Sequence, residues 1–226
     1  MLPEHLFQRQ LARYEQYRAR LARYTAAPLN FDPAHQAAYT AATGWQRDHY
    51  ATTLPPEPPG PALAAGSFAA AQQVMRAYAF PPPALLIGIF DPRAPLEGRP
   101  MLLRARFLGF TFWFGVRVAD VVDEAARPTA AGPEQVWGYG YRTLQGHFER
   151  GQINFGVHKN LATGAVEFRV AAVSQRGRIR NPFYWLGFRL FGRLLQRRFA
   201  RQSLARMRAL VAEALAQPET IPPAVG

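Results

Sequence analysis

The sequence has no cysteine among its 226 residues and only one lysine, Lys159. Without cysteine, the chain cannot form disulfide bonds, use a thiolate as a nucleophile or ligate a metal through sulfur. Serine is scarce too: Ser67, Ser174 and Ser203 are the three present, and none lies in a Gly-x-Ser-x-Gly turn. A serine nucleophile of the hydrolase type is therefore not expected. Phosphate-binding loops and dinucleotide-binding fingerprints are also missing from the sequence.

Acidic residues are few as well. The chain has 15 Asp and Glu against 27 Lys and Arg, so its net charge at pH 7 is +12, and its pI is about 10.9. Scattered carboxylates do not suit a two-carboxylate hydrolase. Such a basic surface should attract nucleic acid, anionic lipid head groups or acidic ligands. The alternative is an ordinary solvated surface in which Arg takes the place of Lys.

Metal-binding patterns and long apolar runs are also absent. The five histidines show no His-x-x-x-His spacing, so we expect neither a metal nor any other cofactor. No apolar run reaches the length of about 18 residues that crosses a membrane, and the charged N-terminus does not resemble a secretion signal. With 49% hydrophobic and 19% charged residues, the chain should fold as a globular cytoplasmic protein.

Residues 1–28 are expected to form an N-terminal extension with one amphipathic helix over 4–24. Apolar residues recur in this segment at spacings of three and four. They are Phe7, Leu11, Tyr14, Tyr17, Leu21 and Tyr24. Such a helix packs on its own domain, or it docks on a partner or a membrane surface. The spacing alone leaves these alternatives open.

The rest of the chain alternates between strand and helix patterns. We expect a short strand within 43–54, a helix over 67–79, strands over 85–90, 101–122, 135–144, 151–159 and 164–175, and a long helix from 183 to about 216. Gly109 or Gly115 should bend or divide the segment 101–122, and residues 123–133 should form a loop. Asn181-Pro182 suits the N-cap and first turn of the last helix.

This order of elements indicates an α+β fold. Strands that follow one another through short turns form an antiparallel sheet. The long C-terminal helix must then bury its apolar face on the concave side of a curved sheet, in a helix-grip arrangement that leaves a cavity between helix and strands. We expect a single domain over 29–217, followed by a disordered tail at 218–226.

Residues 139–155 read YGYRTLQGHFERGQINF. This segment resembles the Tyr-x-Thr-Leu-x-Gly-His-x-Glu-x-Gly core of a bacterial and plant family, domain-of-unknown-function family nineteen-ninety. Residues 166–175 resemble the strand that follows in that family, and the helix from Phe183 onward resembles its C-terminal helix. The resemblance covers roughly residues 66–210 and, more weakly, the region from Leu29 onward.

The resemblance implies a fold similar to START-like lipid-transfer and pollen-allergen domains, and it implies no activity. The family often has Gly-Glu-Glu after the His motif, whereas this chain has Gly151-Gln152-Ile153. A role that requires those two carboxylates therefore does not carry over to this chain.

His147 and Glu149 are the best acid–base candidates, with Tyr141 as a third member. An imidazole and a carboxylate on adjoining turn positions can share a proton near neutral pH. Tyr139, Tyr141 and Thr143 lie at period two on the preceding strand, so their hydroxyl groups point the same way. The structural alternative, which we favour, is that a His beside Gly in a hairpin caps the turn through a backbone hydrogen bond.

Three functions follow from these observations. The first is binding of an apolar or lipid-like small molecule in the cavity, with His147 and arginines near Arg176 orienting a polar or anionic head group. The candidate contact residues are Phe110, Phe112, Phe114, Tyr139, Tyr141, Thr143, His147, Phe155 and Phe168. The second is an enzyme on the same scaffold that uses His147, Glu149 and Tyr141.

The third function is contact with an anionic membrane surface or, less readily, with nucleic acid. Arginines and aromatic residues interleave before and within the last helix, a composition that suits either partner. The basic patch consists of Arg176, Arg178, Arg180, Arg189, Arg193 and Arg197. The alternative is that the aromatic rings belong to the core and that the Arg stems cover its edge.

Overall fold

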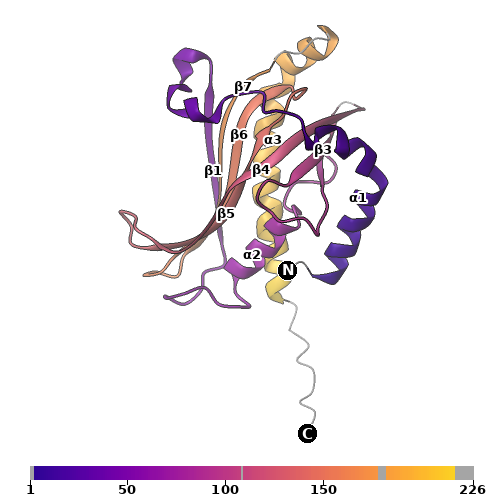
Figure 1. Ribbon diagram of the computed structural model, residues 1–226. Helices are drawn as coiled ribbons and strands as arrows, with labels where there is room; N and C mark the ends of the chain where they lie inside the picture. Colours follow the sequence, from indigo (N-terminus) through magenta and orange to yellow (C-terminus); the bar gives the residue numbers. More distant parts are fainter. Residues whose placement is uncertain (1–2, 108, 178–181, 217–226) are drawn as a thin grey trace.

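The structure, a computed structural model, describes residues 3–107, 109–177 and 182–216, and their side chains except those of 107 and 182–195. In this part of the chain, seven strands form one antiparallel sheet in the order β1-β7-β6-β5-β4-β3-β2. Helices and two short 3-10 turns complete the fold (Figure 1). The elements are α1 (Glu4–Thr25), η1 (Pro33–Ala38), η2 (Ala41–Thr43), β1 (Gln46–Leu54), α2 (Ser67–Arg76), β2 (Leu86–Ile89), β3 (Pro100–Phe107), β4 (Phe110–Arg127), β5 (Glu134–Thr143), β6 (Glu149–Asn160), β7 (Val166–Arg176) and α3 (Pro182–Ala216).

The helix-grip arrangement expected from the sequence is confirmed. The sheet curves around α3, and α2 lies beside α3 (Figure 1). On β3, Met101 and Leu103 belong to the main core, whereas Leu102 between them belongs to a second cluster with Leu21 of α1. Because successive side chains of a strand point to opposite faces, α1 covers the outer face of the sheet.

The helix α1 packs on its own domain, which is one of the alternatives that its spacing allows. Leu21 meets Ile89 and Leu102 on the outer face. The buried side chain of Gln10 donates from Nε2 to the carbonyl oxygens of Gly88, at 3.2 Å, and Phe90, at 3.4 Å. Gly88 belongs to β2, the edge strand, and Phe90 directly follows it. The helix α1 therefore covers an edge that would otherwise be open to pairing.

The main core fills the space between the concave face, α2 and α3. Its centre is aromatic: the ring centroid of Phe80 lies 4.8 Å from that of Phe155 and 5.3 Å from that of Phe168. The hydroxyl of Tyr139 donates to the carbonyl oxygen of Met75 on α2, at 2.8 Å. This bond gives the buried phenol the partner that it needs.

The long segment expected at 101–122 is divided by Gly109. Its φ of +79° is in the left-handed region that glycine adopts without strain, and the turn separates β3 from β4.

The prediction of a loop at 123–133 is wrong for the first residues of this range, because β4 continues to Arg127. Two register shifts against β5 accommodate the extra residues. A bulge leaves its extra residue unpaired, and the pairing of β4 with β5 resumes beyond each shift.

Lys159 forms a buried ion pair at the opposite end of β6 from the His147 turn. Its side chain is 0% exposed, and Nζ donates to Oε2 of Glu57 and to the carbonyl oxygen of Pro61, both at 2.8 Å. Glu57 also accepts the backbone N–H groups of Leu63, at 3.0 Å, and Phe68, at 2.8 Å. The pair thus fixes the proline-rich loop and the first turn of α2 against the sheet.

The domain limits at residues 28 and 217 stay a prediction, and the tail at 218–226 lies outside the described residues. Among the described residues, no helix combines the length and the apolar character needed to cross a membrane.

Candidate ligand-binding site

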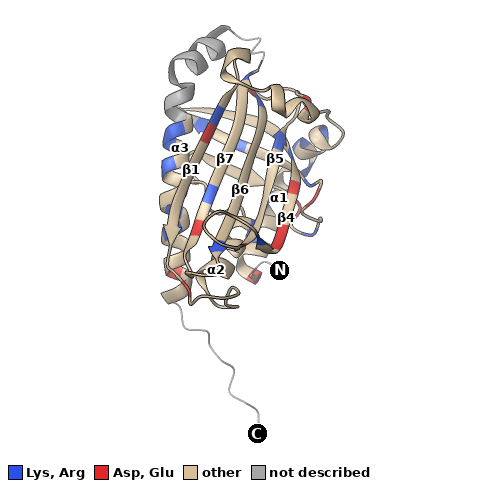
Figure 2. Cartoon of the chain, turned by 90° about the vertical axis from the view of Figure 1, so that its left-hand side faces the viewer, with Lys and Arg blue, Asp and Glu red and all other residues tan. Residues whose placement is uncertain are grey.

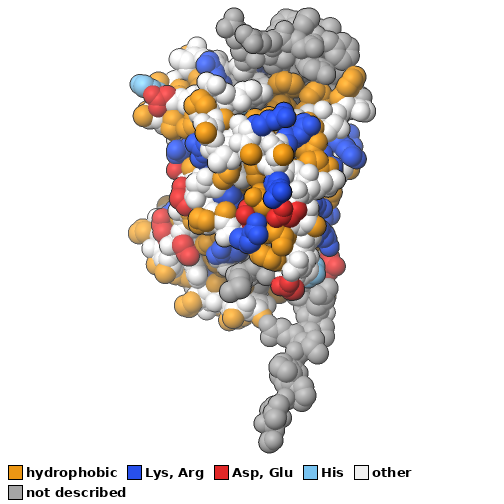
Figure 3. Space-filling model, turned by 45° about the vertical axis from the view of Figure 1, so that its right-hand side comes forward, with side chains coloured by type: hydrophobic (Ala, Val, Ile, Leu, Met, Phe, Trp, Pro, Cys, Tyr) orange, Lys and Arg blue, Asp and Glu red, His pale blue; other side chains and the backbone are white. Residues whose placement is uncertain are grey.

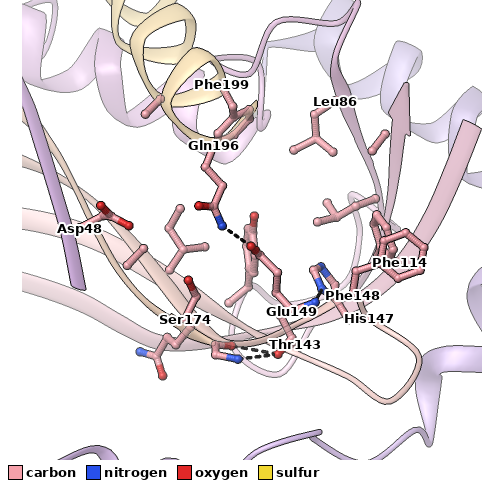
Figure 4. A pocket seen from close by; sticks show the side chains of 18 of the residues that line it. Asp48, Leu86, Phe114, Thr143, His147, Phe148, Glu149, Ser174, Gln196 and Phe199 are labelled. Atoms are coloured by element: carbon pink, nitrogen blue, oxygen red, sulfur yellow. Dashed lines mark hydrogen bonds between the residues drawn. The ribbon is translucent and has the colours of Figure 1, made fainter. Parts of the chain in front are cut away.

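A cavity of about 260 Å³ lies between the concave face of the sheet and α3. All seven strands, the turn between β5 and β6, and α3 contribute to its lining. Most of the wall is apolar. Leu86 and Phe114 lie on one side, and Phe199 of α3 lies opposite the strands (Figure 4). Ile153 of β6 and Val170 of β7 also line the cavity.

The polar and charged groups of the lining come from the β5–β6 turn, from strands on both sides of it and from α3 (Figure 4). They are Asp48, Arg106, Thr143, His147, Glu149, Arg150, Gln152, Ser174 and Gln196, besides the hydroxyl groups of Tyr50 and Tyr141. The cavity therefore has a mostly apolar wall that polar groups interrupt at several points.

His147 is held by its own turn and by an aromatic ring. Its Nδ1 accepts the backbone N–H of Glu149, at 3.0 Å, and its ring centroid lies 4.5 Å from that of Phe114. Burial lowers the pKa of His147 to about 4, because a low-dielectric site disfavours the charged imidazolium. The ring is neutral at pH 7, and a neutral ring that accepts at Nδ1 carries its proton on Nε2.

Glu149 and Tyr141 have separate hydrogen-bond partners. The carboxylate of Glu149 accepts a hydrogen bond from the side-chain amide of Gln196 on α3. The hydroxyl of Tyr141 accepts from that of Tyr78, at 3.4 Å, and burial raises the pKa of Tyr141 to about 12. The phenol is therefore protonated at neutral pH.

Thr143 ties three separate segments together beneath the cavity. Its hydroxyl donates to Oδ1 of Asn30, at 2.6 Å, and accepts the backbone N–H of Gly151, at 2.9 Å. Asn30 in turn donates from Nδ2 to the carbonyl oxygen of Glu149, at 2.8 Å. A Cβ at Gly151 would lie 2.0 Å from the carbonyl oxygen of Val173, so only glycine allows this close approach of β6 to β7.

The sequence-family model described as Domain of unknown function (DUF1990) matches residues 32–206. The chain belongs to the DUF1990 family. The matched range contains the His147 turn, and it begins nearer to the N-terminus than the strongest part of the resemblance at 66–210. No curated protein matches the sequence.

Several solved structures are similar to the DUF1990 chain at low sequence identity. TTHA0849 from Thermus thermophilus is 9% identical with a TM-score of 0.45, over 75% of this chain and 99% of that one. The Zhui aromatase/cyclase from Streptomyces sp. R1128 is 13% identical with a TM-score of 0.44, over 75% and 93%. A norcoclaurine synthase point mutant from Thalictrum flavum is 10% identical with a TM-score of 0.43, over 75% and 95%.

The structure of the DUF1990 domain separates the nine candidate contact residues into three groups. Phe114, Tyr141, Thr143 and His147 line the cavity, as does Glu149. Tyr139, Phe155 and Phe168 are buried in the main core and are not part of the lining. Phe110 and Phe112 lie toward the β3–β4 turn, where Phe110 is 44% exposed, and neither lines the cavity.

Of the predicted basic patch, the described side chains are those of Arg176 and Arg197, and both are exposed. The side chains of Arg178, Arg180, Arg189 and Arg193 lie outside the described residues.

Other residues of the site carry no signal of their own in the sequence. Asn30 reaches Thr143 across 113 positions, and no local pattern marks such a contact. Gln196 and Phe199 belong to the long helix, whose broad apolar face does not show which turn meets the cavity.

Proposed function

We propose that this DUF1990 protein binds a compact, largely apolar small molecule in the cavity beneath α3. The observation that carries the proposal is the cavity itself, with about 260 Å³ of space, mostly apolar walls and a smaller number of polar groups. Ligand sites combine hydrophobic walls with few polar anchors, and they span about 300–1,000 Å³. A volume just below that range favours a molecule of one or two rings over a long acyl chain.

His147 supplies the polar anchor. Its Nδ1 is occupied by the N–H of Glu149, so the Nε2–H group of the neutral ring is the donor available to a ligand. Figure 4 shows the ring at the edge of the cavity beside Phe114. A neutral donor pairs with a carbonyl or hydroxyl oxygen without requiring a charge. We therefore expect the ligand to carry an uncharged oxygen near His147.

The first experiment is native mass spectrometry of the purified protein, followed by organic extraction of whatever is released. A stoichiometric apolar compound with one or a few oxygens supports the proposal. The second experiment measures the binding of 2-naphthol, a compact two-ring phenol, by its fluorescence. No released compound together with no binding of 2-naphthol would overturn the proposal.

A matched pair of variants locates the bound probe. Ala172 on β7 lines the cavity, whereas its neighbour Ala171 does not and points to the opposite face. Ala172→Phe fills the cavity and should weaken the binding of 2-naphthol at least tenfold, whereas Ala171→Phe should leave it within twofold. Equal effects of the two substitutions would place the probe elsewhere.

His147→Asn tests the anchor. The Asn side-chain oxygen can still accept the N–H of Glu149, as in an Asx turn, but it lacks the Nε2–H donor. The variant should weaken the binding of 2-naphthol about fivefold, since a neutral hydrogen bond contributes about 1 kcal/mol, and it should leave the binding of naphthalene unchanged. The same loss for both probes would assign His147 a packing role only.

Acid–base catalysis by His147, Glu149 and Tyr141 has less support. A histidine with a pKa of about 4 is a weak base at neutral pH. The Glu149 carboxylate is bonded to Gln196, and Tyr141 stays protonated. Any turnover that survived unchanged in the His147→Asn variant would exclude this role.

A further inference from the structure

A cluster of three arginines lies on the outer face of the sheet, on the opposite side from the cavity. Arg9, Arg13 and Tyr17 are spaced by four residues, so they follow one line along α1. Arg104 lies on β3 beneath this helix, and its Nη1 donates to the hydroxyl of Tyr17, at 3.5 Å. The line of α1 that carries Arg9 and Arg13 therefore meets the strand that carries Arg104.

The positive charges of this cluster have no counterion in the described part of the chain. Neither hydrogen bonds nor ion pairs join a carboxylate to Arg9, Arg13 or Arg104 there. The nearby acid on α1, Glu15, pairs with Arg18, at 3.7 Å, and with Arg93, at 3.6 Å. Burial and the positive charges of Arg9 and Arg104 lower the pKa of Arg13, as expected where like charges gather.

Arg104 also has an unused donor. Its Nε is buried and has no hydrogen-bond partner, although buried donors are nearly always satisfied. Arg9 is exposed and Arg13 is half-buried, so the cluster is open to solvent on one side. Figure 3 shows the molecule turned so that the α1 side comes forward, and basic side chains are spread over that face.

We propose that Arg9, Arg13 and Arg104 form a binding site for a phosphate group, between α1 and the outer face of β3. Guanidinium groups match phosphate oxygens through paired N–H donors, and donors from a helix and a strand approach a tetrahedral anion from different directions. A bound dianion would neutralise the mutual repulsion of the arginines and supply acceptors for their donors. The site is independent of the cavity and does not rest on the proposed ligand.

Thermal unfolding at pH 7 tests the site. Inorganic phosphate should raise the Tm by several degrees more than sodium chloride does at the same ionic strength, because a ligand of the folded state stabilises it. Arg9→Gln and Arg13→Gln should each remove most of this excess. Without phosphate and at low ionic strength, both variants should melt at or above the wild-type Tm, because they relieve repulsion, and this result would also show that they fold.

Arg18→Gln is the matched control. Arg18 is an exposed arginine on the same helix that pairs with Glu15, and its loss should leave the phosphate effect intact. A phosphate effect no larger than that of chloride, or an equal loss in Arg18→Gln and Arg13→Gln, would overturn the proposal.

Sedimentation with vesicles identifies the source of the phosphate. Binding to phosphatidic acid vesicles but not to phosphatidylcholine vesicles, lost in Arg13→Gln, would assign the site to a lipid head group. Stabilisation by inorganic phosphate without vesicle binding would assign it to a soluble phosphate compound. Tight binding of single-stranded oligonucleotides, reduced equally by substitution of Arg9, Arg13 or Arg18, would replace the single site with an extended nucleic-acid surface.

Discussion

The only lysine of the chain is buried, and its partner is too. Burial opposes the ionisation of Glu57, but Lys159 and the N–H groups of Leu63 and Phe68 outweigh this effect and lower the pKa of Glu57. The pair is an anchor between β6 and the loop that leads into α2. A buried ion pair adds little net stability, but the removal of one partner leaves the other charge buried without a counterion.

Lys159→Met should therefore lower the free energy of unfolding by about 3–5 kcal/mol, the usual cost of an unpaired buried charge. Urea denaturation followed by circular dichroism measures the change. The double variant Lys159→Met, Glu57→Gln removes the charge that remains and should recover part of the loss. A single variant as stable as the wild type would show that Glu57 takes up a proton at little cost.

His147 makes the stability of the fold depend on pH. Its pKa is about 4 in the folded protein and about 6.5 in an unfolded chain, so the unfolded state binds more protons as the pH falls below 6.5. The free energy of unfolding should decrease by about 1.5 kcal/mol between pH 6.5 and pH 5 from this residue. His158, whose pKa is also lowered, first by burial and then by Arg169, acts in the same direction.

Urea denaturation at several pH values isolates the contribution of His147. The His147→Asn variant cannot titrate at this position, so its stability should fall less steeply than that of the wild type over the same pH range. Equal slopes for the two proteins would mean that the imidazole gains its proton in the folded state without penalty.

The elements themselves follow closely from apolar spacing. The helices at 4–24, 67–79 and 183–216 are present within a few residues, because their apolar stripes and the prolines that flank them act locally. The extension of β4 to Arg127 was not predictable in this way. It depends on bulges and on pairing with β5, and neither leaves a local apolar pattern.

The sequence predicts which strand face turns toward the cavity better than it predicts which side chains of that face line the cavity. Phe110, Phe112 and Phe114 occupy alternate positions of β4, but only Phe114 reaches the cavity, because the strand runs toward the exposed β3–β4 turn. Tyr139 and Tyr141 likewise share a face of β5, yet Tyr139 lies under α2 and Tyr141 at the cavity. Alternation along a strand determines which face a side chain occupies. Whether that side chain meets the core or the cavity depends on which helix lies over that part of the strand, and those helices are far away in the sequence.

The charges of the whole molecule are unevenly compensated. On the outer face of the sheet, the strands carry charges of both signs (Figure 2). There, Arg169 of β7 reaches across β6 and donates to both carboxylate oxygens of Glu134 on β5, at 2.8 and 2.9 Å. On α1, by contrast, Arg9 and Arg13 have no such partner among the described residues. The net charge of +12 therefore includes a local repulsion as well as a general one, and both weaken the compact state.

Moderate salt should stabilise the folded protein. Raising the concentration of sodium chloride from about 10 mM to about 100 mM shortens the screening length from about 30 Å to about 10 Å. This change reduces the repulsion between exposed arginines. It weakens the short, half-buried ion pair of Arg169 and Glu134 less. We expect the Tm to rise by several degrees in calorimetry at pH 7. The Arg9→Gln, Arg13→Gln double variant, with its net charge lowered from +12 to +10, should show a smaller rise. A Tm that falls with added salt would mean that ion pairs outweigh repulsion across the molecule, and it would remove the electrostatic basis for an uncompensated arginine cluster on α1.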